Sequence, residues 1–222
     1  MKTIQFEENN EVLEYVIPES WSQVSIGMYQ EFMSKDTDKM NEHELLFHLV
    51  STFCKIPQQK IVKFKKGDID EIYKHVSQLA LTQPKESLNL ILEIDGVEYG
   101  FNSKLDDISF GEFTDLDTFL NDGFENLEKV MSILYRPIVD KDKKKFRVEQ
   151  YDFNECEKRF DVFKNKMSID SAFGCLSFFL NLGTEYTMIS THYLKKQNKK
   201  IMSKQPNNHL EQNGVGMQSS TS

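Results

Sequence analysis

Hydrophobic and polar residues alternate in two parts of the chain, and a turn sequence interrupts each part. Asn9-Asn10 lies within the first alternating part, and Asp95-Gly96, a strong hairpin signal, lies within the second. Each part therefore predicts a β-hairpin. The predicted strands are Ile4–Phe6, Val12–Ile17, Leu90–Ile94 and Val97–Phe101.

A helical spacing of apolar residues follows the first hairpin. Pro18 ends the strand, and Ser25 is a good N-cap for a helix that begins at Ile26. Two further helices are predicted over Leu45–Phe53 and Pro57–Phe64. Asp68 or Asp70 would cap a fourth helix, which carries apolar residues as far as Leu79.

The second hairpin is followed by the same order of elements. Ser109 is placed to cap a helix with an apolar face, and an Asn121–Gly123 turn leads to a helix over Leu127–Leu134 before Arg136-Pro137. The segment Leu105–Phe113 matches Trp21–Tyr29: Ser and Gly are identical, and each apolar position is matched by an apolar one. The chain therefore predicts two related units. The apolar positions of the second capped helix are Phe110, Phe113, Leu116 and Leu120.

The last part of the chain is predicted to form helices followed by a polar tail. Asp140–Lys145 is a run of charges that predicts a solvated loop. Helical spacing continues over Phe153–Lys166 and Ser168–Lys196, whereas the chain from Gln197 is too polar to bury a core and is expected to be disordered.

The predicted fold class is therefore α+β, mainly α. Two tandem units, each a β-hairpin followed by helices, occupy residues 1–85 and 86–139. A C-terminal helical pair over 140–196 packs on these units, and 197–222 forms a basic, polar, disordered tail.

Composition narrows the function classes. The chain has 222 residues with a net charge of −8, and the stretch from Lys195 onward is basic, so the rest is more acidic still. An acidic body disfavours general nucleic-acid binding, because phosphate repels it. No specific nucleic-acid partner is expected. Ala172–Leu182 is the longest apolar candidate but is interrupted by polar residues, and Met1–Glu8 lacks a signal sequence. We expect a cytoplasmic protein without a membrane partner.

Reactive residues are scattered rather than clustered. The three cysteines are far apart and form no CxxC pair, so we expect buried thiols. The single tryptophan, Trp21, is expected in the core. The cysteines are Cys54, Cys156 and Cys175; the five histidines, which show no metal-ligand spacing, are His43, His48, His75, His192 and His209.

Carboxylates gather around the second capped helix. Asp106 and Asp107 precede its start, where the helix dipole stabilises negative charge, and the others suit a solvated helix face. Those others are Glu112, Asp115 and Asp117. We therefore predict no catalytic, cofactor-binding or metal-binding residue and no enzymatic activity, and no partner-binding residue is identified.

The pattern of the first half resembles the tail assembly chaperones of tailed bacteriophages. The resemblance rests on Ile17–Ser25, the helix Leu45–Phe53, the connection Lys55–Ile61 and the helix Asp70–Leu79. Segments of the second half are similar to virion-operon proteins of Bacteroidetes-type phages. These segments are Ile108–Phe113 and Ile133–Pro137.

This resemblance implies a non-enzymatic protein of the host cytoplasm that acts by protein–protein contact during virion assembly. Its partners would be other phage structural proteins, such as the tape-measure protein or tail and neck subunits. A structural virion component, such as a head–tail connector, ring or cargo protein, is the alternative. The oligomeric state stays open.

Overall fold

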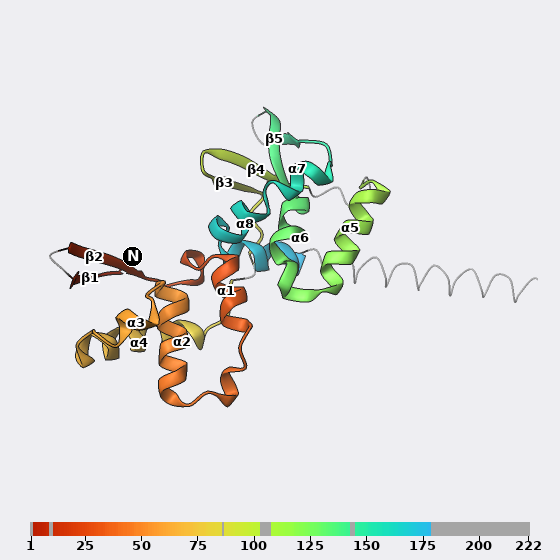
Figure 1. Ribbon diagram of the computed structural model, residues 1–222. Coiled ribbons are helices and arrows are strands. Elements are labelled where there is room, and N and C mark those ends of the chain that lie inside the picture. The colour runs from red at the N-terminus through yellow and green to blue at the C-terminus, as the bar shows by residue number, and fades with distance from the viewer. Residues whose placement is uncertain (1, 9–10, 86, 103–107, 143–144, 179–222) are drawn as a thin grey trace, which may run out of the picture. The chain divides into compact units, whose positions relative to one another are not determined.

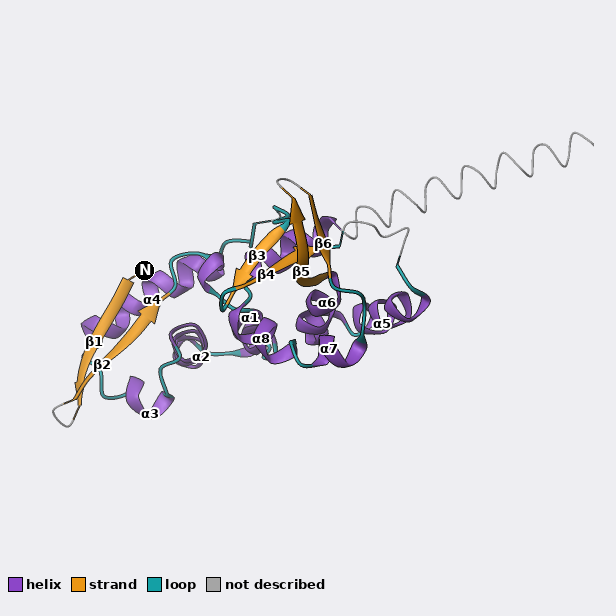
Figure 2. Ribbon diagram, turned by 90° about the horizontal axis from the view of Figure 1, so that it is seen from above, coloured by secondary structure: helices purple, strands orange, loops and turns teal. Residues whose placement is uncertain are grey.

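The computed structural model of this protein describes residues 2–8, 11–85, 87–102, 108–142 and 145–178 (Figure 1). These residues belong to one compact unit, Met1–Phe179. Their fold is α+β and mainly helical, which confirms the predicted class. Figure 2 shows β3, β4, β5 and β6 as one antiparallel sheet, whereas β1 and β2 form a sheet of their own.

The first hairpin consists of β1, Lys2–Glu8, and β2, Glu11–Ile17. Both strands are longer than the sequence pattern indicates, and the predicted Asn9-Asn10 turn lies outside the described residues. The Phe6 ring stacks on Phe64, with 4.4 Å between the ring centroids, and this contact ties the hairpin to the helices that follow.

The helices after this hairpin follow the prediction in number and order. Ser25 caps α1, because its side chain accepts a hydrogen bond from the Met28 N–H. The predicted aspartate cap is wrong: α4 begins earlier, with Lys65 as N-cap, so Asp68 lies inside its first turn, where the helix dipole favours negative charge. The bounds are η1 Trp21–Gln23, α1 Ile26–Met33, η2 Thr37–Lys39, α2 Glu42–Cys54, α3 Gln58–Ile61 and α4 Lys66–Ala80.

The second hairpin forms as predicted. Asp95 and Gly96 both have positive φ, at 50° and 78°, which is the backbone that a two-residue hairpin turn requires. Ser109 caps the following helix by accepting from the Glu112 N–H. The bounds are β3 Ile91–Ile94, β4 Val97–Phe101, α5 Phe110–Asn121, η4 Gly123–Asn126 and α6 Leu127–Leu134.

The predicted charged loop at Asp140–Lys145 is wrong. β5, Tyr135–Asp142, pairs with β4 and with β6, Lys145–Val148, so most of the run lies in strands. Charged side chains are compatible with these strands because they stay exposed. Gly100 of β4 is required here, since a Cβ at that position would lie 2.4 Å from Cε2 of Phe146.

The C-terminal helices begin close to the predicted positions. α7, Phe153–Glu157, and α8, Phe160–Lys166, replace one continuous predicted helix, and residues 169–178 are helical. The rest of the predicted Ser168–Lys196 helix and the predicted tail 197–222 lie outside the described residues. None of the helices within the described ranges combines the length and the apolar character that a bilayer crossing requires.

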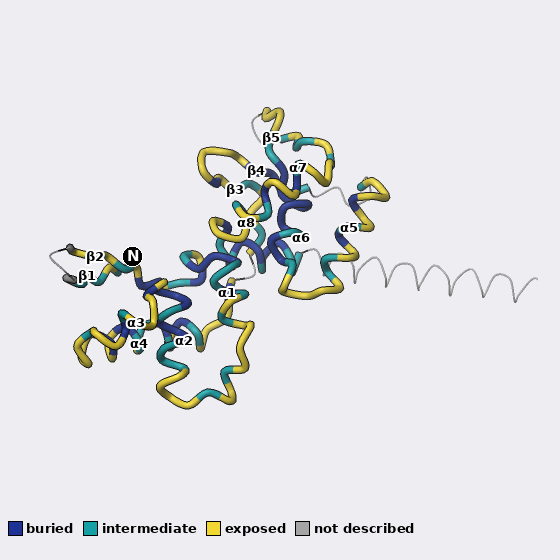
Figure 3. Tube along the Cα trace, in the orientation of Figure 1, coloured by how far each residue is buried: buried dark blue, intermediate teal, exposed yellow. Residues whose placement is uncertain are grey.

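α6 forms the centre of the core. All of its residues except Lys129 are buried, and it contacts α5, α7, α8 and β5. Figure 3 shows this burial as dark blue along α6, in contrast to the yellow that covers much of α5. α6 therefore holds the surrounding helices together, and α5 lies at the margin of this core.

The structure does not clearly show two tandem units. The order hairpin, capped helix, 3-10 turn and helix occurs twice, yet only the second hairpin is extended by β5 and β6. The sheet also contains residues from both sides of the boundary predicted between 139 and 140. The duplication stays a prediction from the sequence.

Candidate functional site

The most exposed aromatic side chains of the described residues lie on α5. Phe110 is 85% exposed and Phe113 is 55% exposed, although both belong to the apolar pattern that predicts this helix. The two residues are three positions apart, so they share one face of the helix. Leu116, from the same pattern, is buried. The apolar pattern of α5 therefore divides between the core and the surface.

The buried face of α5 carries a charge. Glu112 and Arg136 are 3% and 4% exposed, and Arg136 Nη2 lies 3.2 Å from Glu112 Oε1. The Asn102 side-chain amide donates to the same oxygen, at 3.3 Å. The sequence interpretation of Glu112 as part of a solvated face is wrong, because the first residues of β5 bring the guanidinium of Arg136 beneath α5.

Asp115, a second carboxylate of α5, is also held by a hydrogen bond. The Tyr151 hydroxyl donates a hydrogen bond to Asp115, which is half-buried rather than fully solvated as predicted. Burial raises the pKa of the Tyr151 phenol, and its bond to Asp115 raises it further. Asp117 is exposed, as predicted, whereas Asp106 and Asp107 lie outside the described residues.

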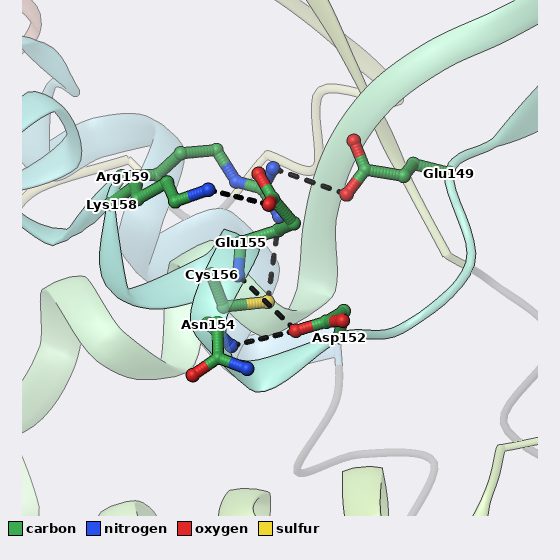
Figure 4. Close-up of polar contacts among 7 residues, drawn as sticks. All are labelled: Glu149, Asp152, Asn154, Glu155, Cys156, Lys158 and Arg159. Carbon is green, nitrogen blue, oxygen red and sulfur yellow. Dashed lines mark hydrogen bonds and ion pairs between the residues drawn. The ribbon is translucent and has the colours of Figure 1, made fainter.

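A second buried arginine, Arg159, lies between α7 and α8 (Figure 4). Its Nη1 is 3.3 Å from Glu149 Oε1, and its Nη2 lies 3.5 Å from the Sγ of Cys156. Asp152 caps α7 by accepting from the Asn154 and Glu155 N–H groups. Burial raises the pKa of the Cys156 thiol, and the guanidinium of Arg159 opposes that rise. The thiol therefore lacks the lowered pKa of a reactive cysteine.

Among the described residues, neither Arg136 nor Arg159 has a hydrogen-bond partner for every donor of its guanidinium group. The Nε atoms of Arg136 and Arg159 are buried and have no hydrogen-bond partner in the part of the chain that the structure describes. A buried charge pair with an unpaired donor costs stability relative to an apolar contact. We interpret these pairs as contacts that fix the position of α5 and α7, rather than as a chemical centre.

Two adjoining clefts lie elsewhere, between α1, the end of α2 and the end of α8. Their volumes are about 390 and 440 Å³, and both are lined by Ser25, Met28, Lys55 and Asn165. Neither is lined by the charged residues around α5. Each cleft is lined by two lysines and one glutamate. Within the described residues, no group of His, Cys, Asp and Glu is arranged to hold a metal.

The residues considered for chemistry are dispersed. All three cysteines are buried and free, as predicted. His48 is buried and bonded to the Phe32 carbonyl, His75 lies 2.8 Å from Lys2 Nζ, and His43 is exposed. The other two, His192 and His209, lie outside the described residues.

Trp21 is buried, as predicted, and its Nε1 donates to the Thr82 hydroxyl at 2.9 Å.

The sequence did not predict that Arg136 is buried or that Glu112 pairs with it. The burial of Glu112 could have been predicted from its spacing, because it lies four residues before Leu116 and therefore on the same face of the helix.

Comparison of this chain with protein families, with curated proteins and with solved structures found no match.

Proposed function

We propose that this protein is a non-enzymatic phage assembly protein that acts by protein–protein contact, as a tail assembly chaperone. The observation that carries the proposal is the pair Phe110 and Phe113, which α5 exposes to solvent. Aromatic side chains, phenylalanine among them, are enriched at protein interfaces. The resemblance of Ile17–Ser25 and the helices after it to tail assembly chaperones gives the contact its biological setting.

The surroundings of the aromatic pair support a binding role. Asp117 lies one helical turn after Phe113 and is exposed, and Asp152 is exposed next to Tyr151. The ring of Tyr151 packs near Gly111, at 3.9 Å from the position of a Cβ there. An aromatic surface with the Asp117 carboxylate beside it favours a partner segment with apolar and basic residues. The Glu112–Arg136 pair would hold α5 in place, which limits the entropy lost on binding.

Mass spectrometry of purified particles and of the lysate that produced them tests the assembly role. A chaperone should be abundant in the lysate and absent from finished particles. A fixed number of copies per particle would overturn the chaperone proposal and support the structural virion component instead.

Co-expression with the tape-measure protein of the same phage tests the surface. The wild-type chain should keep that protein in the soluble fraction, and Phe110→Ser with Phe113→Ser should lose this effect. Leu81→Ser is a matched control, because Leu81 is 87% exposed but lies after α4. Equal solubility with all variants would remove α5 as the binding surface.

A further inference from the structure

The start of α1 is covered by a short extended segment of the same chain. Ser168 forms an antiparallel bridge with Ser25, the Ile26 N–H donates to the Met167 carbonyl at 3.1 Å, and the Ile169 N–H donates to the Val24 carbonyl at 2.8 Å. The first N–H groups of a helix have no partner within the helix, so this segment satisfies one of them.

Apolar side chains complete the cover. Met167 and Ile169, on either side of the bridging serine, are buried together with Ile26. The Tyr29 ring meets the edge of Phe173, from the helix that follows the segment, at 5.4 Å between centroids. The pattern apolar, small polar, apolar thus covers the start of a serine-capped helix, and Phe173 of the next helix contacts the first aromatic residue of that helix.

The start of α5 has the same local backbone. Ser109 has φ −68° and ψ 158°, and Ser25 has φ −76° and ψ 162°; each side chain accepts from the N–H three residues ahead. Within the described residues, however, no backbone group pairs with the Phe110 N–H or the Ile108 carbonyl. Phe110 and Phe113, which match Ile26 and Tyr29, are the exposed aromatic pair described above.

We propose that the start of α5 binds an extended apolar–small–apolar segment of the partner protein, with basic residues beside it, in the way that Met167–Ile169 covers α1. The segment would accept a hydrogen bond from the Phe110 N–H, donate one to the Ile108 carbonyl and cover Phe110. A residue beyond the segment would contact Phe113, as Phe173 contacts Tyr29. The exposed carboxylate of Asp117 matches the basic flank. This inference rests on the proposed function and specifies the chemistry of its partner.

A peptide of residues 164–172, Lys-Asn-Lys-Met-Ser-Ile-Asp-Ser-Ala, is a suitable probe, titrated into the isotope-labelled full chain and followed by NMR. We expect saturable shifts at Ile108–Phe113 that weaken as salt is raised. Phe110→Ser should weaken binding about tenfold, and Leu81→Ser should leave it unchanged. The same peptide with serine in place of both apolar residues should not bind.

Absence of saturable shifts at Ile108–Phe113, or shifts at Val24–Ile26 instead, would overturn this docking mode. The outcome is separable from that of the proposed function. If the peptide fails but the double variant Phe110→Ser with Phe113→Ser still abolishes solubilisation of the tape-measure protein, the docking mode is wrong and the chaperone proposal stands. If the peptide binds but the protein is found at fixed copy number in particles, the docking mode stands and the chaperone role does not.

Discussion

α1 and α5 begin in the same way and end up in different surroundings. Each is capped by a serine and starts with the same pattern of apolar residues. In α1, Ile26 is 0% exposed and Tyr29 is 9% exposed, whereas the matching Phe110 and Phe113 of α5 face solvent. The comparison shows that this pattern specifies a helix but does not decide which of its faces is buried.

Neighbouring elements make the difference. α1 contacts α2, α6 and α8, so several sides of this helix are covered. α5 contacts α6 and the 3-10 turn that joins them, and it buries Glu112 where α1 has the half-buried Met28. A helix with few neighbours has room to turn a charged residue inward, provided that a counter-charge such as Arg136 is present.

The largest expected effect comes from breaking the charge pair that only α5 has. Arg136→Met leaves the Glu112 carboxylate buried without its partner and should cost about 3–5 kcal/mol of unfolding free energy. The double variant Glu112→Met with Arg136→Met should recover much of that loss, because both buried charges are removed together. Urea unfolding of the three proteins measures this, and a loss below about 1 kcal/mol in the single variant would show that the pair does not anchor α5.

Matched substitutions at the first residue of each helix test the burial difference directly. Ile26→Ala should cost about 2–5 kcal/mol because it opens a cavity in the core. Phe110→Ala should change stability by no more than about 0.5 kcal/mol, since the ring is exposed. Thermal and urea unfolding compare the two. Similar losses at both positions would mean that α5 is covered in solution as α1 is.

Substituting alanine for the glycine after each of these residues should change the stability of the protein in opposite directions. A Cβ on Gly27 would lie 3.0 Å from Cγ and 3.1 Å from the carbonyl oxygen of Lys164, so Gly27→Ala should destabilise by about 1–3 kcal/mol. At Gly111 the nearest atom would be 3.9 Å away, so Gly111→Ala should stabilise by up to about 1 kcal/mol through helix propensity. Equal signs in melting experiments would contradict the different packing of the two helices.

The local signals were sufficient for most elements. Asp95-Gly96 specified a hairpin because its two residues readily adopt positive φ, and Ser25 and Ser109 marked helix starts through a contact within one turn. The β5–β6 pair was missed for the opposite reason. Its strands depend on pairing with β4, far away in the sequence, and charges at exposed strand positions look like a loop when no partner strand is known.

In the candidate site, too, some features follow from the local sequence and others from contacts between distant segments. The apolar character of Phe110 and Phe113 is visible in the sequence, but their exposure depends on which elements pack beside α5. The partner of Glu112 could not be predicted, because Arg136 reaches it only through the path of β5 after α6.

The sequence by itself determined the mainly helical α+β class, the two hairpin-and-capped-helix segments, the buried cysteines and the absence of any recognisable catalytic motif. These features depend on residues close together along the chain or on simple hydrophobicity. Only the tertiary structure decided that β3–β6 form one sheet, that Glu112 pairs with Arg136, and that Met167–Ile169 covers α1 while α5 keeps its aromatic residues exposed. Each of these depends on contacts between distant segments, which compete for the same apolar surfaces and are settled only when the whole chain packs.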